Sequence, residues 1–127
     1  MANMTTPLKR VRGLGSARSG TDHFWIQRLT ALANVPLVLF FLVLVISLAG
    51  ESYDVVLDRL SSPLVAIIFV LTIASIAIHM RVGMQVVIED YIHRDPTRVL
   101  LLIANTFFSL FVAAASIFAI LKISFGG

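Results

Sequence analysis

The stretch that decides the fold is PLVAIIFVLTIASIAIHM, residues 63–80. It carries no Asp, Glu, Lys or Arg, and its apolar residues run continuously instead of alternating with polar ones as in a half-buried strand. About 20 helical residues, at about 1.5 Å each, cross the roughly 30 Å hydrocarbon core of a membrane. Two more uncharged apolar stretches of comparable length lie on either side, at 29–49 and 99–121. The pattern predicts three membrane-spanning helices, over residues 27–49, 63–88 and 97–122.

The composition excludes a soluble globular domain. The chain has 127 residues, of which 58% are hydrophobic and only 13% charged, and its mean hydropathy is +0.95. Soluble domains carry about 25% charged residues, and a chain this short has too small an interior to bury so much apolar surface. We therefore predict an all-α integral membrane protein with three transmembrane helices.

The cysteine count and the net charge narrow the functional classes. The chain has no cysteine, which excludes disulfides, thiolate metal sites and iron–sulfur clusters held by this chain. The formal net charge is +3, and most of the positive charge lies in the N-terminal tail. Nucleic-acid binding is therefore not indicated, and the basic tail is typical of a membrane topology signal.

The chain divides into a tail and one domain. Residues 1–20 are expected to form a basic cytoplasmic tail, and residues 21–127 a single three-helix transmembrane domain. Within the tail, the segment GLGSA at 13–17 is expected to be loose. The first apolar stretch is longer than the core of a signal peptide and follows a long polar tail, so it is interpreted as a true span.

Prolines mark the predicted helix boundaries. Ser62-Pro63 and Asp95-Pro96 each offer an N-cap residue followed by proline in the first helical position. Pro36 lies inside the first span and predicts a kink, which neighbouring helices tolerate in a membrane.

The distribution of Lys and Arg predicts the orientation. By the positive-inside rule, the N-terminus is cytoplasmic and the C-terminus periplasmic, with Lys122 as a single dissenting charge. Phe24 and Trp25, beside the first span, are expected to anchor it at the interface. The basic residues are Lys9, Arg10, Arg12, Arg18 and Arg28 before the first uncharged stretch and Arg94 and Arg98 in the second connection, whereas the first connection has Glu51, Asp54 and Asp58 against Arg59.

One ionisable residue lies deep in the second span. His79 follows Pro63 by 16 residues, or about 24 Å of helix, which puts it in the cytoplasmic half of the bilayer. At about 100° per residue, Asp90 returns to within about 20° of the direction of His79, and Tyr91 is offset by about 120°. The polar or small residues that share the face of His79 are Thr72, Ser75 and Gly83.

This face has the features of a haem site. Imidazole binds iron while remaining uncharged, and a glycine one turn away, Gly83, leaves room for a flat porphyrin ring. One histidine supplies one ligand, so a six-coordinate haem needs its second ligand from another chain.

Each feature also has a structural interpretation. His79 could simply hydrogen-bond to a neighbouring helix, and Thr72 and Ser75 could join helices, as could Asn105, Ser109 and Ser116 in the third span. Asp90 could pair with Arg94 four residues on, and Tyr91 could belong to an interfacial aromatic belt. Arg81 points about 160° away from His79, towards the interface or a partner.

The second span and its continuation resemble a known family. The motif HMRVGM at 79–84 followed by EDYIH at 89–93 is similar to the second helix of the small hydrophobic membrane-anchor subunit of succinate dehydrogenase. The family's pattern is matched at His79, Gly83, Asp90 and Tyr91. The three-span layout and the segment GTDHFWIQR at 20–28 also resemble the family, and the tail is similar to alphaproteobacterial members.

The resemblance implies a role in succinate:ubiquinone oxidoreductase, respiratory complex II, in a bacterial inner membrane. A flavoprotein subunit with FAD oxidises succinate, and an iron–sulfur subunit passes the electrons to the membrane. This chain, which lacks the succinate site, and a larger cytochrome b anchor subunit hold haem b and help to bind ubiquinone. The implied roles are His79 as axial ligand of the haem iron, Ser75 and Gly83 as haem-packing residues, Tyr91 and Asp90 as quinone-binding residues, and Arg28 as a cation for a haem propionate or the quinone site.

Two other functional classes remain open from the residues alone. A small proton-coupled transporter or channel could use His79 and Asp90 as a relay. A purely structural subunit could use the polar face only to join helices. The sequence assigns no role to His23 or His93. In some relatives a His-Asp pair precedes the phenylalanine, whereas here the order is Asp22-His23.

Overall fold

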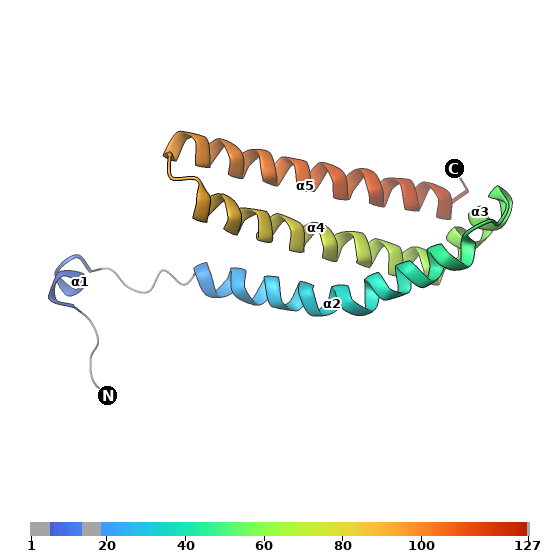
Figure 1. Ribbon diagram of the computed structural model, residues 1–127, viewed down its shortest axis with the longest axis horizontal. Coiled ribbons are helices and arrows are strands. Elements are labelled where there is room, and N and C mark those ends of the chain that lie inside the picture. Colours follow the sequence, from blue (N-terminus) through green and yellow to red (C-terminus); the bar gives the residue numbers. More distant parts are fainter. Residues whose placement is uncertain (1–5, 14–18, 127) are drawn as a thin grey trace, which may run out of the picture.

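The computed structural model describes residues 6–13 and 19–126. These residues form five helices and no strand, which confirms the predicted all-α fold. Figure 1 shows α2, α4 and α5 as three long helices in an antiparallel row, with α4 in the middle. The helices are α1 (Pro7–Val11), α2 (Ser19–Leu48), α3 (Tyr53–Ser61), α4 (Pro63–Tyr91) and α5 (Asp95–Ser124).

Each long helix is sufficiently long and apolar to cross a membrane. Windows of 18 residues within Thr21–Leu48, Pro63–Tyr91 and Asp95–Ser124 have mean hydropathies of 2.6, 2.3 and 2.1. The three predicted spans are therefore confirmed as helices. The first helix begins earlier than predicted, at Ser19, because the polar residues before the apolar stretch continue the same helix. The predicted loose segment at 13–17 falls, apart from Gly13, outside the described residues.

Pro36 lies inside α2, as the sequence predicts. Proline has no N–H to donate to the helix and its ring crowds the preceding turn. Figure 1 shows α2 bending in its middle part, so that its second half turns towards α3. The predicted kink thus agrees with the shape of the helix.

The first connection contains a helix that the sequence reading missed. Helix α3 spans Tyr53–Ser61 and packs against α4 and α5. Its apolar side chains Val56, Leu57 and Leu60 are half-buried, while its carboxylates are exposed. The hydroxyl of Ser61 lies 2.7 Å from the carbonyl oxygen of Leu57 and 3.3 Å from that of Ile123, which ties α3 to the end of α5.

One of the two predicted N-caps is wrong. Ser62 is the N-cap of α4, with Pro63 at the first helical position, although its hydroxyl makes no capping bond. Helix α5 starts at Asp95, one residue before the first helical position that the Asp95-Pro96 pair predicts and two before the predicted span, with Arg94 as the N-cap. The Asp95 carboxylate lies in the first turn and accepts a hydrogen bond from Arg98 Nη2 at 2.6 Å.

The row of helices leaves most of its apolar surface uncovered. Helix α4 packs against both α2 and α5, which share no comparable contact with each other. No described side chain is less than 2% exposed. The apolar flanks must therefore face lipid or other membrane chains. The buried side chains are Leu44, Ala66, Thr72, Val82, Ile88 and Ser109.

A polar bond holds α5 to α4. The Asn105 amide donates to the backbone oxygen of Arg81 at 2.9 Å. Asn105 thus has the helix-joining role that its position in the third span suggested. Thr72 does not, because its hydroxyl bonds to Ile68 O of its own helix at 2.7 Å.

Candidate functional site

His79 lies at the contact between α4 and α2. Its Nδ1 atom is 3.0 Å from the hydroxyl of Thr30 on α2, and its ring is half-buried. No described residue forms a hydrogen bond with its other ring nitrogen, Nε2. Because the two nitrogens act separately, the helix-joining and the iron-binding interpretations of His79 are compatible.

A polar stripe on α2 faces the polar side of α4 that carries His79. The sequence analysis did not predict this stripe. Its members recur at intervals of four, three and four residues, so they share one face of the helix. Three of them carry a buried polar atom without a hydrogen-bond partner: His23 Nδ1, Gln27 Oε1 and Asn34 Oδ1. A buried polar atom without a hydrogen-bond partner lowers the stability of the folded protein. The stripe consists of His23, Gln27, Thr30 and Asn34.

Ser75 extends the polar contact on the other helix. It lies one turn before His79 on α4, as Asn34 lies one turn after Thr30 on the antiparallel α2. Its hydroxyl oxygen is buried and has no partner. Four of the five unpartnered buried atoms of the described side chains thus belong to these two stripes; the fifth is Ser109 Oγ on α5.

Gly83 lies directly opposite Gln27. A Cβ atom built on Gly83 would be 3.2 Å from Gln27 Nε2, closer than an ordinary van der Waals contact. The sequence predicts open space for a porphyrin beside this glycine. In the structure the Gln27 amide lies in that space. Gly83 therefore allows α2 to approach α4 closely.

Substitutions of Gly83 test this close approach. Gly83→Ala should change stability little, since the Gln27 amide ends a flexible side chain and needs to move only a few tenths of an ångström. Gly83→Leu overpacks the contact, which costs about 1–3 kcal/mol. Thermal melting of the detergent-solubilised protein should therefore separate the two variants by several degrees. Equal melting temperatures would contradict a tight α2–α4 contact at this residue.

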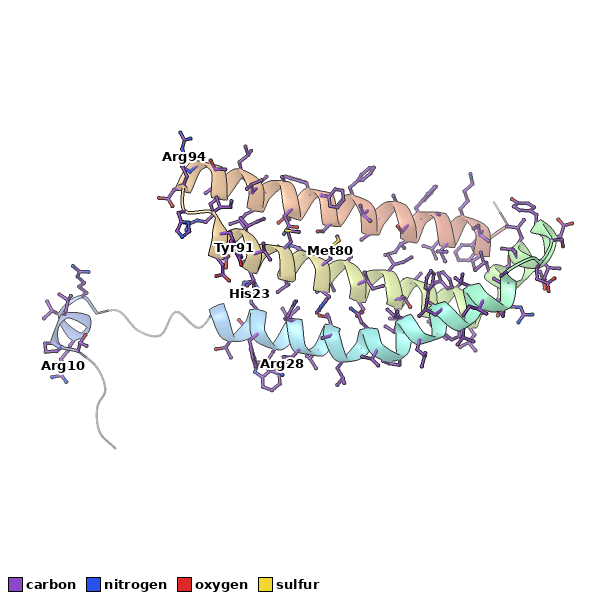
Figure 2. All side chains as sticks on the ribbon, in the orientation of Figure 1. Arg10, His23, Arg28, Met80, Tyr91 and Arg94 are labelled. Carbon is purple, nitrogen blue, oxygen red and sulfur yellow. The ribbon has the colours of Figure 1, made fainter. Side chains whose placement is uncertain are left out.

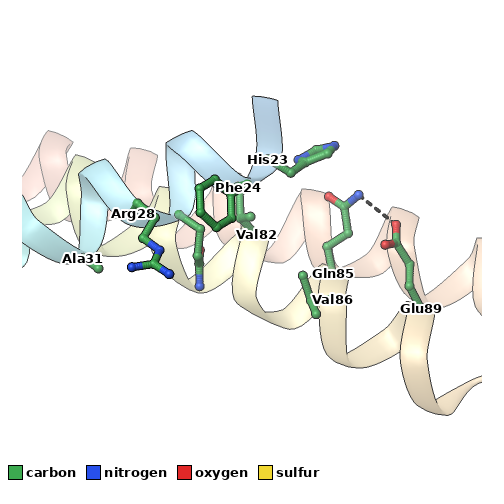
Figure 3. A pocket seen from close by; sticks show the side chains of 9 residues that line it. His23, Phe24, Arg28, Ala31, Val82, Gln85, Val86 and Glu89 are labelled. Carbon is green, nitrogen blue, oxygen red and sulfur yellow. Dashed lines mark hydrogen bonds between the residues drawn. The ribbon is translucent and has the colours of Figure 1, made fainter. Parts of the chain in front are cut away.

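A groove opens where α2 begins and α4 ends. Its volume is about 530 Å³, and Figure 3 shows the side chains that line it. Gln85 Nε2 donates to Glu89 Oε1 at 2.9 Å, while the Arg28 guanidinium lies 5.0 Å from the ring centroid of Phe24. Arg28 has no carboxylate partner among the described residues. The lining residues are His23, Phe24, Gln27, Arg28, Ala31, Val82, Gln85, Val86 and Glu89.

Tyr91 lies on the other side of α4. It lines a groove of about 520 Å³ between α4 and α5, together with Ile88, Asn105 and Phe108. It is the last residue of α4, its side chain is 77% exposed, and its hydroxyl has no described hydrogen-bond partner. Figure 2 shows Tyr91 and His23 at the same end of the helix row. The 120° offset from His79 that helical phase indicates agrees with this placement.

Asp90 lines neither groove. It is exposed, and the predicted alternative of an ion pair with Arg94 is wrong, because α4 ends before Arg94. Within residues 6–13 and 19–126, the single ion pair joins Arg98 to Asp95. Glu89, which the sequence reading did not select, is the carboxylate that faces α2.

The remaining polar residues of α4 point elsewhere. Arg81 borders a groove of about 310 Å³ on the α5 side, beside Thr106 and Ser109. His93 is exposed in the short connection between α4 and α5. In the part of the chain that the structure describes, no three His, Asp or Glu side chains gather in a metal-binding group.

The fold and the site define a class: a membrane protein of three long apolar helices, with one histidine within the central helix and with largely uncovered apolar flanks. Comparison of the sequence identifies the family. The family of succinate dehydrogenase/fumarate reductase transmembrane subunits matches residues 2–119. The chain belongs to this family.

Individual relatives agree. The chain is 31% identical over 121 residues to the succinate dehydrogenase hydrophobic membrane anchor subunit of Paracoccus denitrificans, covering 95% of this chain and 93% of that protein. It is 32% identical over 111 residues to the subunit of the same name from Rickettsia bellii (strain RML369-C), covering 87% and 89%. The succinate dehydrogenase membrane anchor subunit of Reclinomonas americana is 35% identical over 86 residues, or 65% of this chain and 71% of that protein. No solved structure matches the chain at a comparable level of significance.

Proposed function

We propose that this chain is the small anchor subunit of a bacterial succinate:ubiquinone oxidoreductase. With a larger cytochrome b anchor subunit it holds haem b and forms part of the ubiquinone site, and it docks the flavoprotein and iron–sulfur subunits at the membrane. Its family membership supports the anchor role. The observation that carries the haem role is the free Nε2 atom of His79 inside an apolar span.

The residues at the α2–α4 contact fit a haem. The Nδ1 atom of His79 is hydrogen-bonded to Thr30, and its Nε2 atom is available to bind iron. Metal-binding histidines usually have one ring nitrogen on the metal and the other in a hydrogen bond. The unpartnered Ser75 hydroxyl lies one turn before His79, where the ring would pack. Packing of the ring against Gly83, one turn after His79, would require the Gln27 side chain to move away. Haem b supplies a one-electron carrier within the membrane. The larger anchor subunit would supply the other ligand.

Arg28 is the cation of this site. Its guanidinium has no carboxylate partner among the described residues and borders the groove at the start of α2. Arginine binds carboxylates through paired hydrogen bonds. A haem propionate or the quinone site is therefore a suitable partner for Arg28.

Tyr91 and Asp90 belong to the quinone site. Reduction of a quinone takes two electrons and two protons, so the site needs a hydrogen-bond donor near water. Tyr91 offers a phenol without an internal partner at the end of α4, and Asp90 next to it is exposed. Tyr91 donates to a quinone carbonyl oxygen, and Asp90 orients and charge-balances the site.

The charges at the two ends of the row support the orientation. Arg28, Arg94 and Arg98 lie at the end where α2 and α5 begin, whereas Asp54 and Asp58 lie on α3 at the other end (Figures 1 and 2). The basic end is cytoplasmic by the positive-inside rule. The iron–sulfur subunit therefore docks at the end that carries Tyr91.

Purification of the tagged protein under mild conditions tests this function. We expect flavin- and iron–sulfur-containing subunits to co-purify, together with haem b bands in the reduced-minus-oxidised spectrum. Succinate should reduce ubiquinone in this preparation. A colourless homo-oligomer that conducts protons would instead support the transporter alternative, and co-purification without haem would contradict the role of His79.

A further inference from the structure

Among the described residues, Thr30 is the one hydrogen-bond partner of the His79 ring. Its oxygen has three neighbours: Ile26 O at 2.7 Å, Gln27 O at 3.2 Å and His79 Nδ1 at 3.0 Å. A hydroxyl has one hydrogen to donate and two lone pairs to accept with. The direction of each bond can therefore be worked out.

The carbonyl oxygens decide the direction. Neither Ile26 O nor Gln27 O has a hydrogen, so a separation of 2.7 Å from the Thr30 oxygen is favourable only if the hydroxyl hydrogen lies between them. The hydroxyl thus donates to the backbone of its own helix. Its remaining contact, with His79 Nδ1, must then be one in which the imidazole N–H donates and the hydroxyl oxygen accepts.

We infer that Thr30 is a positioning residue that fixes the tautomer of His79. With the proton on Nδ1, the lone pair of the neutral ring lies on Nε2, the atom that no described residue contacts by a hydrogen bond. The ring is also held in one orientation about its bond to α4. This inference rests on the proposed function, because it concerns the readiness of Nε2 to bind the haem iron.

The same bond adjusts the electronic properties of the ligand. Donation from Nδ1–H makes the imidazole a stronger base, and loss of such a partner typically weakens metal binding about 10- to 100-fold. A stronger basic ligand favours the ferric over the ferrous haem. Without the Thr30 oxygen, the haem midpoint potential should therefore become more positive.

Three variants of the full complex test the inference. Thr30→Val has nearly the shape of threonine but no oxygen, so haem binding should weaken about 10- to 100-fold, the midpoint potential should rise and the ferric EPR signal should shift. Thr30→Ser retains the hydroxyl and should restore all three. Thr72→Val is the matched control: Thr72 is 5% exposed and its hydroxyl bonds only to Ile68 O, so the same chemical change should leave the haem unaltered.

The outcomes separate this inference from the proposed function. Dye-linked succinate oxidation and the flavin content report whether each variant has assembled. Haem signals in Thr30→Val that match the wild type would overturn the role of Thr30 and leave the proposed function intact, as would an equal shift in Thr72→Val. If the wild-type complex contains no haem, both the positioning role and the haem part of the proposed function are wrong.

Discussion

The spectrum of low-spin haem b should disappear from the purified complex when His79 is replaced by alanine. A methyl group has no lone pair for iron, and no other histidine of this chain lies within the span of α4. The haem would then be held by the partner chain alone. It either leaves the complex or becomes five-coordinate and high-spin. The ratio of haem to flavin and the reduced-minus-oxidised spectrum measure the two results.

A second substitution separates iron binding from helix joining. His79→Gln keeps an amide that can hydrogen-bond to the Thr30 hydroxyl, so a structural role survives while the axial ligand is lost. His93→Ala is the matched control, because His93 is exposed outside the helices. A normal haem spectrum in His79→Ala would contradict the assignment of His79 as a haem ligand. Loss of haem in both His79 variants, with succinate oxidation by a dye acceptor retained, would establish it.

The membrane spans were predictable from the sequence because lipid imposes a strong requirement on composition. Every residue of a span must be tolerated in hydrocarbon, so an uncharged stretch such as 63–80 has few alternative structures. The orientation of His79 relative to Ser75 and Gly83 was also predictable, since residues three or four apart share a helix face. These three residues indeed lie along the contact with α2 or within one turn of it.

The partner of His79 was harder to find because the first span was recognised by its apolar residues. Thr30 and Asn34 lie inside the uncharged stretch 29–49 and Gln27 just before it, so the many apolar neighbours hid these polar residues. Their spacing of three and four residues would have shown that they share one helix face with His23. Which helix faces His79 depends on tertiary packing, which no local pattern of α4 contains.

The position of the neighbouring helix α2 explains why Glu89 was not predicted. Helical phase puts Asp90 within about 20° of His79, yet Glu89 lines the groove towards α2 and Asp90 does not. The two residues differ by about 100° around the helix, and the position of the neighbouring helix decides which one is covered. Helix α3 was not predicted for a different reason: it has only nine residues, and a helix this short depends on its packing against α4 and α5 for stability.

Tyr91→Phe should lower succinate:ubiquinone reductase activity by about tenfold or more. A hydrogen bond to a group that gains negative charge contributes about 1.5–3 kcal/mol, and about 1.4 kcal/mol corresponds to a tenfold change in rate. The quinone oxygen becomes more negative as it is reduced, so the phenol stabilises the transition state more than the bound substrate. Succinate oxidation by an artificial dye acceptor should remain near the wild-type level, because electrons reach the dye without the quinone site.

The position of Tyr91 makes this substitution a clean test. Its side chain is 77% exposed in this chain and its hydroxyl has no described partner, so removing the oxygen breaks no internal hydrogen bond. Tyr53 on α3 is the matched control: it is 74% exposed, likewise without a described partner, and lies at the opposite end of the row. Tyr53→Phe should therefore leave both activities unchanged. If Tyr91→Phe loses the dye-linked and quinone-linked activities equally, the tyrosine supports assembly and does not bind the quinone; if it loses neither, the quinone carbonyl has another donor.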